Sequence, residues 1–279
     1  MKKIIINILL LAAGLFMCCP VIFLITGSVM GTEELGIRLG AVLAEKGSFA
    51  RWALLPDFPT LRHFIELLLD SPEFFVMFWN SVKITLGILA GQLLTGTGAA
   101  WAFARYRFPF RRALFLVYIL LMVLPFQVTM LSGYLVLNSL KLTDTLWSVI
   151  LPGAFSTFPV FIMYRFFCGI PDAVVEAAEI DGAGPVRIFW HIGIPLGSSG
   201  ILSCVVLGFL ECWNLIEQPM TFLKTKSLWP LSLYLPNVSL QRAGSAFAAS
   251  VVTLTPAILV FIWGKDYLES GIAAAAIKE

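Results

Sequence analysis

Residues 171–195 read PDAVVEAAEIDGAGPVRIFWHIGIP and form a polar island in an otherwise apolar chain. The segments on both sides are almost continuously apolar and long enough to cross a bilayer, which takes about 20 residues. The titratable side chains of the island are Asp172, Glu176, Glu179, Asp181, Arg187 and His191. The island is too short for a domain of its own, so we expect it to lie at a membrane surface with a span at each end.

The composition of the chain is that of an integral membrane protein. Of its 279 residues, 59% are hydrophobic and 13% are charged, and the mean hydropathy is +0.89. Soluble domains carry about 25% charged residues, and several membrane-spanning helices produce such a deficit of charge. The net charge of +2 comes without a basic cluster typical of nucleic-acid binding, so no nucleic-acid partner is expected.

Six apolar segments predict an all-α integral membrane fold. The expected spans are residues 4–27, 79–103, 113–136, 145–167, 196–216 and 244–264. The first begins like a signal peptide, but it is long for one and lacks a good cleavage site, so it is expected to remain as a helix. Pro125 predicts a kink in the third span. Because no linker or repeat divides the chain, residues 1–279 are expected to form one transmembrane domain.

Basic residues predict the orientation of these spans. Lys2 and Lys3 precede the first span, and the short loop after the second span carries Arg105, Arg107, Arg111 and Arg112. Lys and Arg are enriched in cytoplasmic loops. Both termini, this loop and residues 171–195 are therefore expected in the cytoplasm.

Residues 28–76 are expected to form an extracytoplasmic loop, since acids outnumber bases there by seven to four. A helix over residues 60–69 is predicted within it, because apolar side chains recur at helical spacing. These side chains are Leu61, Phe64, Ile65, Leu68 and Leu69. The stripe is expected to pack on the membrane surface or on neighbouring spans.

The chain lacks the motifs of an enzyme. It has no G-x-x-x-x-G-K-[ST] loop for nucleotide phosphates. His63 and His191 are its only histidines, and its five cysteines have no C-x-x-C spacing, so no catalytic triad, metal site or bound cofactor is expected. The GSSG at 197–200 lacks the spacing of a nucleophile elbow and is expected to let the chain turn into the fifth span.

Four polar side chains within the spans are candidates for a translocation pathway. Glu211 lies about two-thirds of the way across the fifth span, where it either faces a water-filled pathway or is hydrated by the outer surface. Gln92, Gln127 and Asn214 either line a pathway for a hydroxyl-rich substrate or form hydrogen bonds between helices. Both interpretations stand for each residue.

The island itself predicts two short helices. Pro171 suits a helix start, and the helix dipole favours acids such as Asp172 in the first turn. Gly182 supplies a turn, because glycine adopts the left-handed conformation at little cost. A second helix is expected from Pro185 and is expected to end at Ile194-Pro195.

The spacing of residues in the island resembles the EAA loop of bacterial ABC importer permeases. That loop reads E-A-A-x3-G-x9-I-x-L-P. The matching residues are Glu176, Ala177, Ala178, Gly182, Ile192 and Pro195, with Ile194 in place of Leu. An EAA triplet alone suits any helix, but the full spacing before the next-to-last span is specific.

Other stretches resemble the carbohydrate-importing branch of that family and its second permease subunit. They are Asn80-Ser81, AAWAFARYRFPFRR at 99–112, IPDAVVEAAEIDGA at 170–183, Trp213-Asn214 and the tail GIAAAAIKE. The likeness covers most of residues 78–279. The tail departs from it at Ala275 and Glu279, where relatives tend to have glycine.

The resemblance implies the permease fold and a non-catalytic subunit in a bacterial-type cell membrane, surrounded by lipid. It implies a second permease subunit, two ATP-binding subunits and an extracytoplasmic solute-binding protein as partners. The island would couple to the ATPase, with Glu176 in polar contact and Gly182 allowing the turn. The implied cargo is a sugar or sugar derivative. A permease for an amino acid, peptide or polyamine, and a secondary carrier, stand as alternatives.

Overall fold

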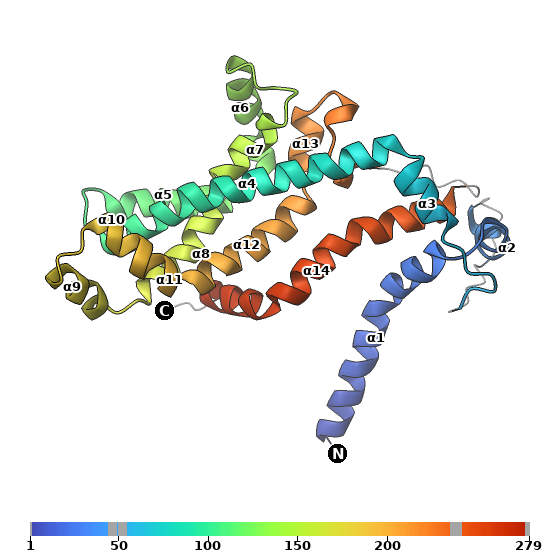
Figure 1. Ribbon diagram of the computed structural model, residues 1–279, viewed down its shortest axis with the longest axis horizontal. Helices are drawn as coiled ribbons and strands as arrows, with labels where there is room; N and C mark the ends of the chain where they lie inside the picture. Colours follow the sequence, from blue (N-terminus) through green and yellow to red (C-terminus); the bar gives the residue numbers. More distant parts are fainter. Residues whose placement is uncertain (1, 44–48, 50–54, 235–241, 277–279) are drawn as a thin grey trace. The chain divides into compact units, whose positions relative to one another are not determined.

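The computed structural model describes residues 2–43, 49, 55–234 and 242–276, and most of them are helical (Figure 1). The α-helices are α1 (Lys2–Ser28), α2 (Thr32–Leu43), α3 (Arg62–Leu69), α4 (Pro72–Arg105), α5 (Arg111–Val123), α6 (Phe126–Ser139), α7 (Trp147–Ala154), α8 (Thr157–Cys168), α9 (Asp172–Ile180), α10 (Pro185–Ile188), α11 (Ile194–Leu196), α12 (Ser198–Trp213), α13 (Glu217–Phe222) and α14 (Ala243–Ala276). A π-helical turn, η1, covers Phe189–Gly193, and two 3₁₀ turns are η2 (Lys226–Leu228) and η3 (Leu231–Leu233). The described residues contain no strand beyond an isolated bridge between Met30 and Pro59, which confirms the all-α fold.

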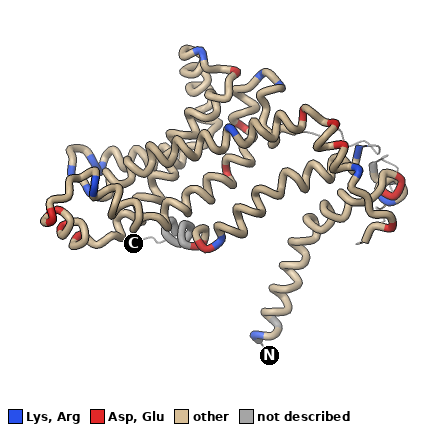
Figure 2. Tube along the Cα trace, in the orientation of Figure 1, with Lys and Arg blue, Asp and Glu red and all other residues tan. Residues whose placement is uncertain are grey.

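Six helical segments of the described chain correspond in order to the six expected spans. Four are long and apolar enough to cross a membrane: Ile6–Ser28, Pro72–Arg105, Trp147–Cys168 and Ala243–Glu269. The other two are bent pairs, Arg111–Val123 with Phe126–Ser139 and Pro185–Leu196 with Ser198–Trp213. Charged residues are sparse along the spans and gather near their ends (Figure 2).

The third span is bent more sharply than the kink expected from Pro125. Helix α5 ends at Val123, α6 begins at Phe126, and their axes differ by 104°. Leu124 and Pro125 are extended, because a residue that precedes proline avoids the helical conformation and the proline ring clashes with the preceding turn. The third span therefore consists of two short helices.

The contacts divide the chain into two compact units. One comprises Met1–Phe75 and Tyr234–Pro256, and the other comprises Val76–Leu233 and Ala257–Glu279. Helices α4 and α14 each contribute residues to both units. The single domain over residues 1–279 stays a prediction.

In the first unit, residues 28–76 contain more helix than the sequence predicted, because α2 was not expected. Glu34 of α2 accepts hydrogen bonds from the backbone N–H groups of Asp57 (3.0 Å) and Phe58 (3.4 Å). Arg38, one turn later, donates to Asp57 at 2.6 Å. These contacts fix the chain before α3 against α2.

The apolar stripe expected on α3 does not pack on neighbouring helices among the described residues. The buried side chains of α3 are His63 and Leu67, whereas Leu61, Ile65, Leu68 and Leu69 are exposed and Phe64 is half-buried. His63 Nε2 lies 3.0 Å from the carbonyl oxygen of Met30. A side chain at Gly244 would collide with the His63 ring, so burial of this histidine decides which face of α3 points inward.

In the second unit, α4 packs closely against α7. A Cβ atom at Gly91 would come within 2.3 Å of the Ala154 Cβ, a separation that real structures do not show. Gly98, further along α4, would meet nothing within 4 Å. The glycines of the second span therefore differ in role, and Gly91 is required for the contact between the two helices.

Asp144 joins the loop before α7 to the loop after α13. Its carboxylate accepts hydrogen bonds from the Thr225 hydroxyl (2.6 Å) and from the backbone N–H groups of Lys224 (2.8 Å) and Thr225 (2.9 Å). The Thr225 hydroxyl is the largest cause of a pKa of Asp144 below its ordinary value. The ionised carboxylate thus accepts hydrogen bonds from N–H groups of the turn after α13, which lie outside any helix.

We predict opposite effects of alanine at the two glycines of α4. Gly91→Ala should lower the unfolding temperature of the detergent-solubilised protein, because overpacking costs about 1–3 kcal/mol. Gly98→Ala is the matched control and should leave stability unchanged or raise it by up to about 1 kcal/mol, since alanine favours a helix. Thermal unfolding followed by circular dichroism measures both, and equal responses would contradict the packing of α4 on α7.

Candidate functional site

The two helices expected in the island are both present. Helix α9 covers Asp172–Ile180, with Pro171 just before its first turn, and it has no fully buried side chain. Its Val175 and Ala178 are half-buried and pack on a core of aromatic and aliphatic residues from α4, α8 and α12. Helix α9 therefore rests on the ends of the spans with one face and exposes the other.

Gly182 makes the turn after α9. Its φ is +79°, a conformation that other residues adopt only with strain. The turn is closed by hydrogen bonds from the N–H of Gly182 to the Glu179 carbonyl (3.0 Å) and from the N–H of Ala183 to the Ala178 carbonyl (2.9 Å). Because a Cβ atom here would meet nothing within 4 Å, glycine is required by the backbone conformation rather than by space.

The second helix does not end at Ile194-Pro195, and this part of the sequence prediction is wrong. Helices α10, η1 and α11 form one helical run from Pro185 to Leu196, and the axis changes direction by 68° at Gly197. The N–H of Ile194 bonds to the Phe189 carbonyl five residues back, and this wide turn accommodates the ring of Pro195. The turn expected at GSSG is thus present, and it is the only break before α12 in this described segment.

Two glycines bring this bend close to the neighbouring spans. A Cβ atom at Gly193 would lie 2.9 Å from the Trp101 ring of α4, and one at Gly197 would lie 2.3 Å from the Phe167 ring of α8. The rings of Trp101 and Phe167 also contact each other edge-on, with centroids 5.3 Å apart. The start of the fifth span is therefore held against both α4 and α8.

The matching EAA residues divide between the two faces of these helices. The exposed ones are Glu176, Ala177, Gly182 and Pro195, and the half-buried ones are Ala178 and Ile192. Large apolar side chains of the same helices are exposed as well: Val174 (40%), Ile180 (86%), Val186 (71%) and Trp190 (60%). An exposed apolar surface of this kind is typical of a protein interface.

Arg105, at the end of α4, fixes the start of α9. Its guanidinium donates to the carbonyl oxygens of Phe167 (2.9 Å) and Ile170, and it forms an ion pair with Asp172. It also lies 5.5 Å from the centroid of the Trp101 ring. The last carbonyls of a helix lack partners within it; the Phe167 carbonyl also accepts a longer bond from the N–H of Ile170 (3.3 Å), and Arg105 adds the shorter one. Arg105 thus connects α4 to the end of α8 and to the start of α9.

This role of Arg105 is not visible in the sequence, where Arg105 is one of several basic residues that predict orientation. The partners of Arg105 are 62–67 residues away along the chain, so no local pattern could have identified the contact.

Gln92 is accounted for by helix packing. It is 7% exposed, and its Nε2 donates to the Gly153 carbonyl at 3.0 Å, which joins α4 to α7. Of the two interpretations for this residue, the hydrogen bond between helices is the one that the geometry favours.

The other three pathway candidates are exposed. Gln127 of α6 donates to Glu217 of α13 at 2.7 Å. Glu211 and Asn214 are exposed and lie three residues apart at the end of α12. Glu217 is a polar residue that the sequence analysis did not select, because its contact spans 90 residues. Within the described ranges, no three His, Cys, Asp or Glu side chains gather as a metal site would require.

A family model described as "Binding-protein-dependent transport system inner membrane component" matches residues 84–274. The arabinooligosaccharides transport system permease protein AraQ of Halalkalibacterium halodurans is 29% identical over 80% of this chain and 81% of its own length. A probable ABC transporter permease protein of Pyrococcus horikoshii is 30% identical over 82% of this chain and 85% of its own length. The sn-glycerol-3-phosphate transport system permease protein UgpE of Yersinia enterocolitica is 27% identical over 73% and 74%.

A solved structure shares the fold. In the crystal structure of a bacterial ABC transporter involved in the import of the acidic polysaccharide alginate, one chain matches with a TM-score of 0.78 and 21% identity. The match covers 95% of this chain and 96% of that one. A second structure, the bacterial alginate ABC transporter in complex with an alginate pentasaccharide-bound periplasmic protein, matches with a TM-score of 0.52 and 18% identity.

We predict that Arg105→Ala loosens α9. The change removes one hydrogen bond from each of the carbonyls of Phe167 and Ile170, and Phe167 keeps only the longer bond from the N–H of Ile170 (3.3 Å), so hydrogen exchange of residues 170–182 should accelerate by about tenfold. Asp172→Asn is the matched control and should have a small effect, because the Asp172 side chain is 85% exposed. Hydrogen-exchange mass spectrometry in detergent measures both, and an equal effect of the two variants would show that only the ion pair matters.

Proposed function

Because the chain belongs to the family of binding-protein-dependent transport system inner membrane components, we propose that it is one permease subunit of an ATP-driven importer for a sugar or sugar derivative. The observation that carries the proposal is the family match over residues 84–274. The cargo class is supported by relatives named for arabinooligosaccharides and sn-glycerol-3-phosphate, and by a shared fold with a chain of an alginate importer. A different solute is the alternative, with a secondary carrier as the weaker one.

In this proposal the chain forms half of the translocation pathway and a second permease subunit forms the other half. Exposed Glu211 and Asn214 at the end of α12, together with the pair of Gln127 and Glu217, supply carboxylates and amides that can bind hydroxyl groups. An extracytoplasmic solute-binding protein delivers the cargo to the outer side. Gln92 is left out of this pathway because it is buried between helices.

The proposed engine is a pair of ATP-binding subunits, one of which binds the exposed face of α9 and the helical run after it. Glu176 and Ala177 lie on that face, beside exposed Ile180 and Trp190. Movement of the ATP-binding subunit is transmitted to α4 through Arg105 and the contact of Gly193 with Trp101, and to α12 through the helical run Pro185–Leu196. This chain itself is then non-catalytic, and both termini and residues 171–195 are cytoplasmic.

Transport by the complete assembly tests the proposal. Membrane vesicles that contain this permease with its partner subunits and binding protein should accumulate the sugar bound by that protein only when ATP is supplied on the side of the membrane that faces the ATP-binding subunits. Accumulation driven by a proton gradient without ATP would overturn the proposal in favour of a secondary carrier. ATP-dependent uptake of an amino acid, peptide or polyamine instead would overturn the proposed sugar cargo.

The turn at Gly182 offers a sharper test of coupling. We predict that Gly182→Ala reduces ATP-dependent uptake and co-purification of the ATP-binding subunit, because its positive φ costs a side-chain-bearing residue about 1–2 kcal/mol. Gly184→Ala is the matched control: its φ is −72° and a Cβ atom meets nothing within 4 Å, so uptake should be unchanged. Normal coupling in both variants would contradict a role for this turn.

A further inference from the structure

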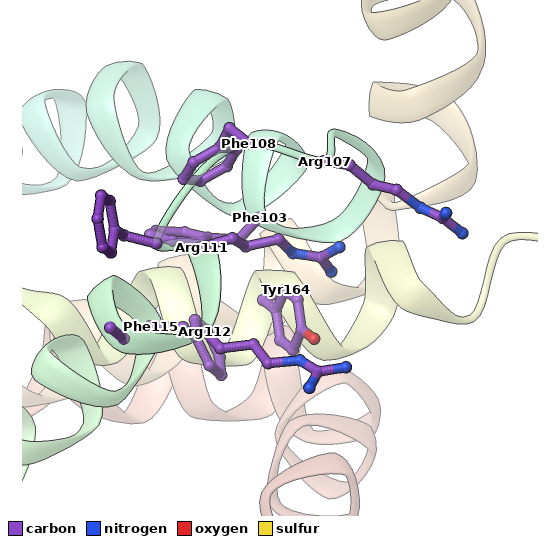
Figure 3. A pocket seen from close by; sticks show the side chains of 9 residues that line it. Phe103, Arg107, Phe108, Arg111, Arg112, Phe115 and Tyr164 are labelled. Atoms are coloured by element: carbon purple, nitrogen blue, oxygen red, sulfur yellow. The ribbon is translucent and has the colours of Figure 1, made fainter.

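A cavity of about 870 Å³ lies where the ends of α4, α5 and α8 meet, at the loop that joins α4 to α5 (Figure 3). Its lining combines the charged side chains Arg107, Arg111 and Arg112 with the hydroxyl of Tyr164 and several phenylalanine rings. Charged side chains and apolar rings thus share one concave surface at the end of a span, the level at which basic and aromatic residues gather in membrane proteins.

The positive charge of this cavity is uncompensated by the chain. No acidic side chain lines it. Within the part of the chain that the structure describes, neither Arg107, Arg111 nor Arg112 forms an ion pair. Arg105, from the same basic stretch, is paired with Asp172 and does not line the cavity. Three arginines without a counter-ion favour an anion in the cavity.

Hydrogen-bond donors of the cavity lie on one side of it, where they could meet a single anion. Figure 3 shows the guanidinium groups of Arg111 and Arg112 and the hydroxyl of Tyr164 pointing toward the same side of the cavity. Tyr164 interacts with Arg111, and its ring packs on Phe115 with centroids 4.3 Å apart. Arginine forks pair with phosphate oxygens through two parallel hydrogen bonds, and the hydroxyl adds a further donor.

The surroundings of the cavity suit an amphiphile rather than a free ion. Phe110 lines the cavity with φ of +63° and leaves 81% of its side chain exposed. From there, Leu114, Val117 and Leu121 continue along one face of α5 and are 46–49% exposed. A headgroup among the arginines would therefore leave its acyl chains along an apolar helix face, at the level where aromatic residues sit in membranes.

We propose that this cavity binds the phosphate headgroup of an anionic phospholipid. The end of α4 is predicted to be cytoplasmic, and that leaflet supplies anionic lipids to basic pockets between spans. A lipid headgroup and free phosphate would both offer phosphate oxygens to the arginines. The exposed apolar face of α5 favours the lipid, because it can hold the acyl chains. Because Arg107 of the lining lies two residues after Arg105, an occupied site would hold the loop that follows the residue that fixes α9.

The test uses the complete transporter in nanodiscs of phosphatidylcholine, with and without phosphatidylglycerol. Native mass spectrometry of the detergent-released complex counts retained phosphatidylglycerol, and titration of that lipid gives an apparent affinity. We expect Arg111→Gln and Arg112→Gln each to weaken retention by about tenfold. Lys265→Gln is the matched control, since it removes one exposed positive charge elsewhere and should change nothing.

Tyr164→Phe is a gentler second variant. It keeps the ring that packs on Phe115 and removes only the hydroxyl, so folding should be preserved and retention should fall by about threefold to tenfold. Its unfolding temperature in phosphatidylcholine alone should equal that of the wild type. Reduced lipid retention in this variant, with unchanged unfolding temperature, ties the effect to the site rather than to the fold.

Three outcomes would overturn the proposal. Retention that responds equally to Lys265→Gln and Arg112→Gln would indicate general charge attraction. Retention that is unaffected by the arginine and Tyr164 variants would place the lipid elsewhere. Inorganic phosphate that displaces phosphatidylglycerol at low concentration and binds with the same dependence on the variants would make the site one for the free ion.

Discussion

The packing of the Trp101 ring at the end of α4 is the constraint on which the site depends. One side of this ring leaves no room for a side chain at Gly193, its edge meets Phe167, and the Arg105 guanidinium lies over its face. Gly193 and Phe167 belong to two other helical segments, η1 and α8, whereas Arg105 is on α4 itself, one turn after Trp101. Burial of the apolar surface stabilises the Trp101 ring in this position. The face of the ring in turn stabilises the positive charge of Arg105 through a cation–π contact.

This junction fixes the exposed helix α9 to the ends of the spans. Helix α9 has no fully buried side chain, and only Val175 and Ala178 pack on the core, so its apolar packing alone holds it weakly. Arg105 replaces that packing with directed hydrogen bonds to the carbonyls at the end of α8. The face of α9 that carries Glu176 is thereby left free, while its opposite end is fixed to a span. A partner that binds the free face acts on α4 and α8 together.

The basic stretch after α4 has two separate roles. Arg105 turns inward to the backbone of α8, whereas Arg107, Arg111 and Arg112 surround a cavity that α5 and Tyr164 complete. In the sequence these arginines look alike, and their shared property, positive charge, predicts orientation. Their different partners arise because α4 ends at Arg105 and the chain then turns into α5.

The sequence by itself determined the helices, their order and the family, because apolar runs of spanning length and the spacing from Glu176 to Pro195 are local patterns. It also determined the turn at Gly182, since only glycine adopts that conformation cheaply. Its prediction of a break at Pro195 failed because a π turn accommodates the ring. Only the tertiary structure decided the contacts of Arg105, the bond from Gln127 to Glu217 and the cavity beside Tyr164. These join residues far apart in the chain, and their geometry depends on how helices pack rather than on any neighbouring sequence.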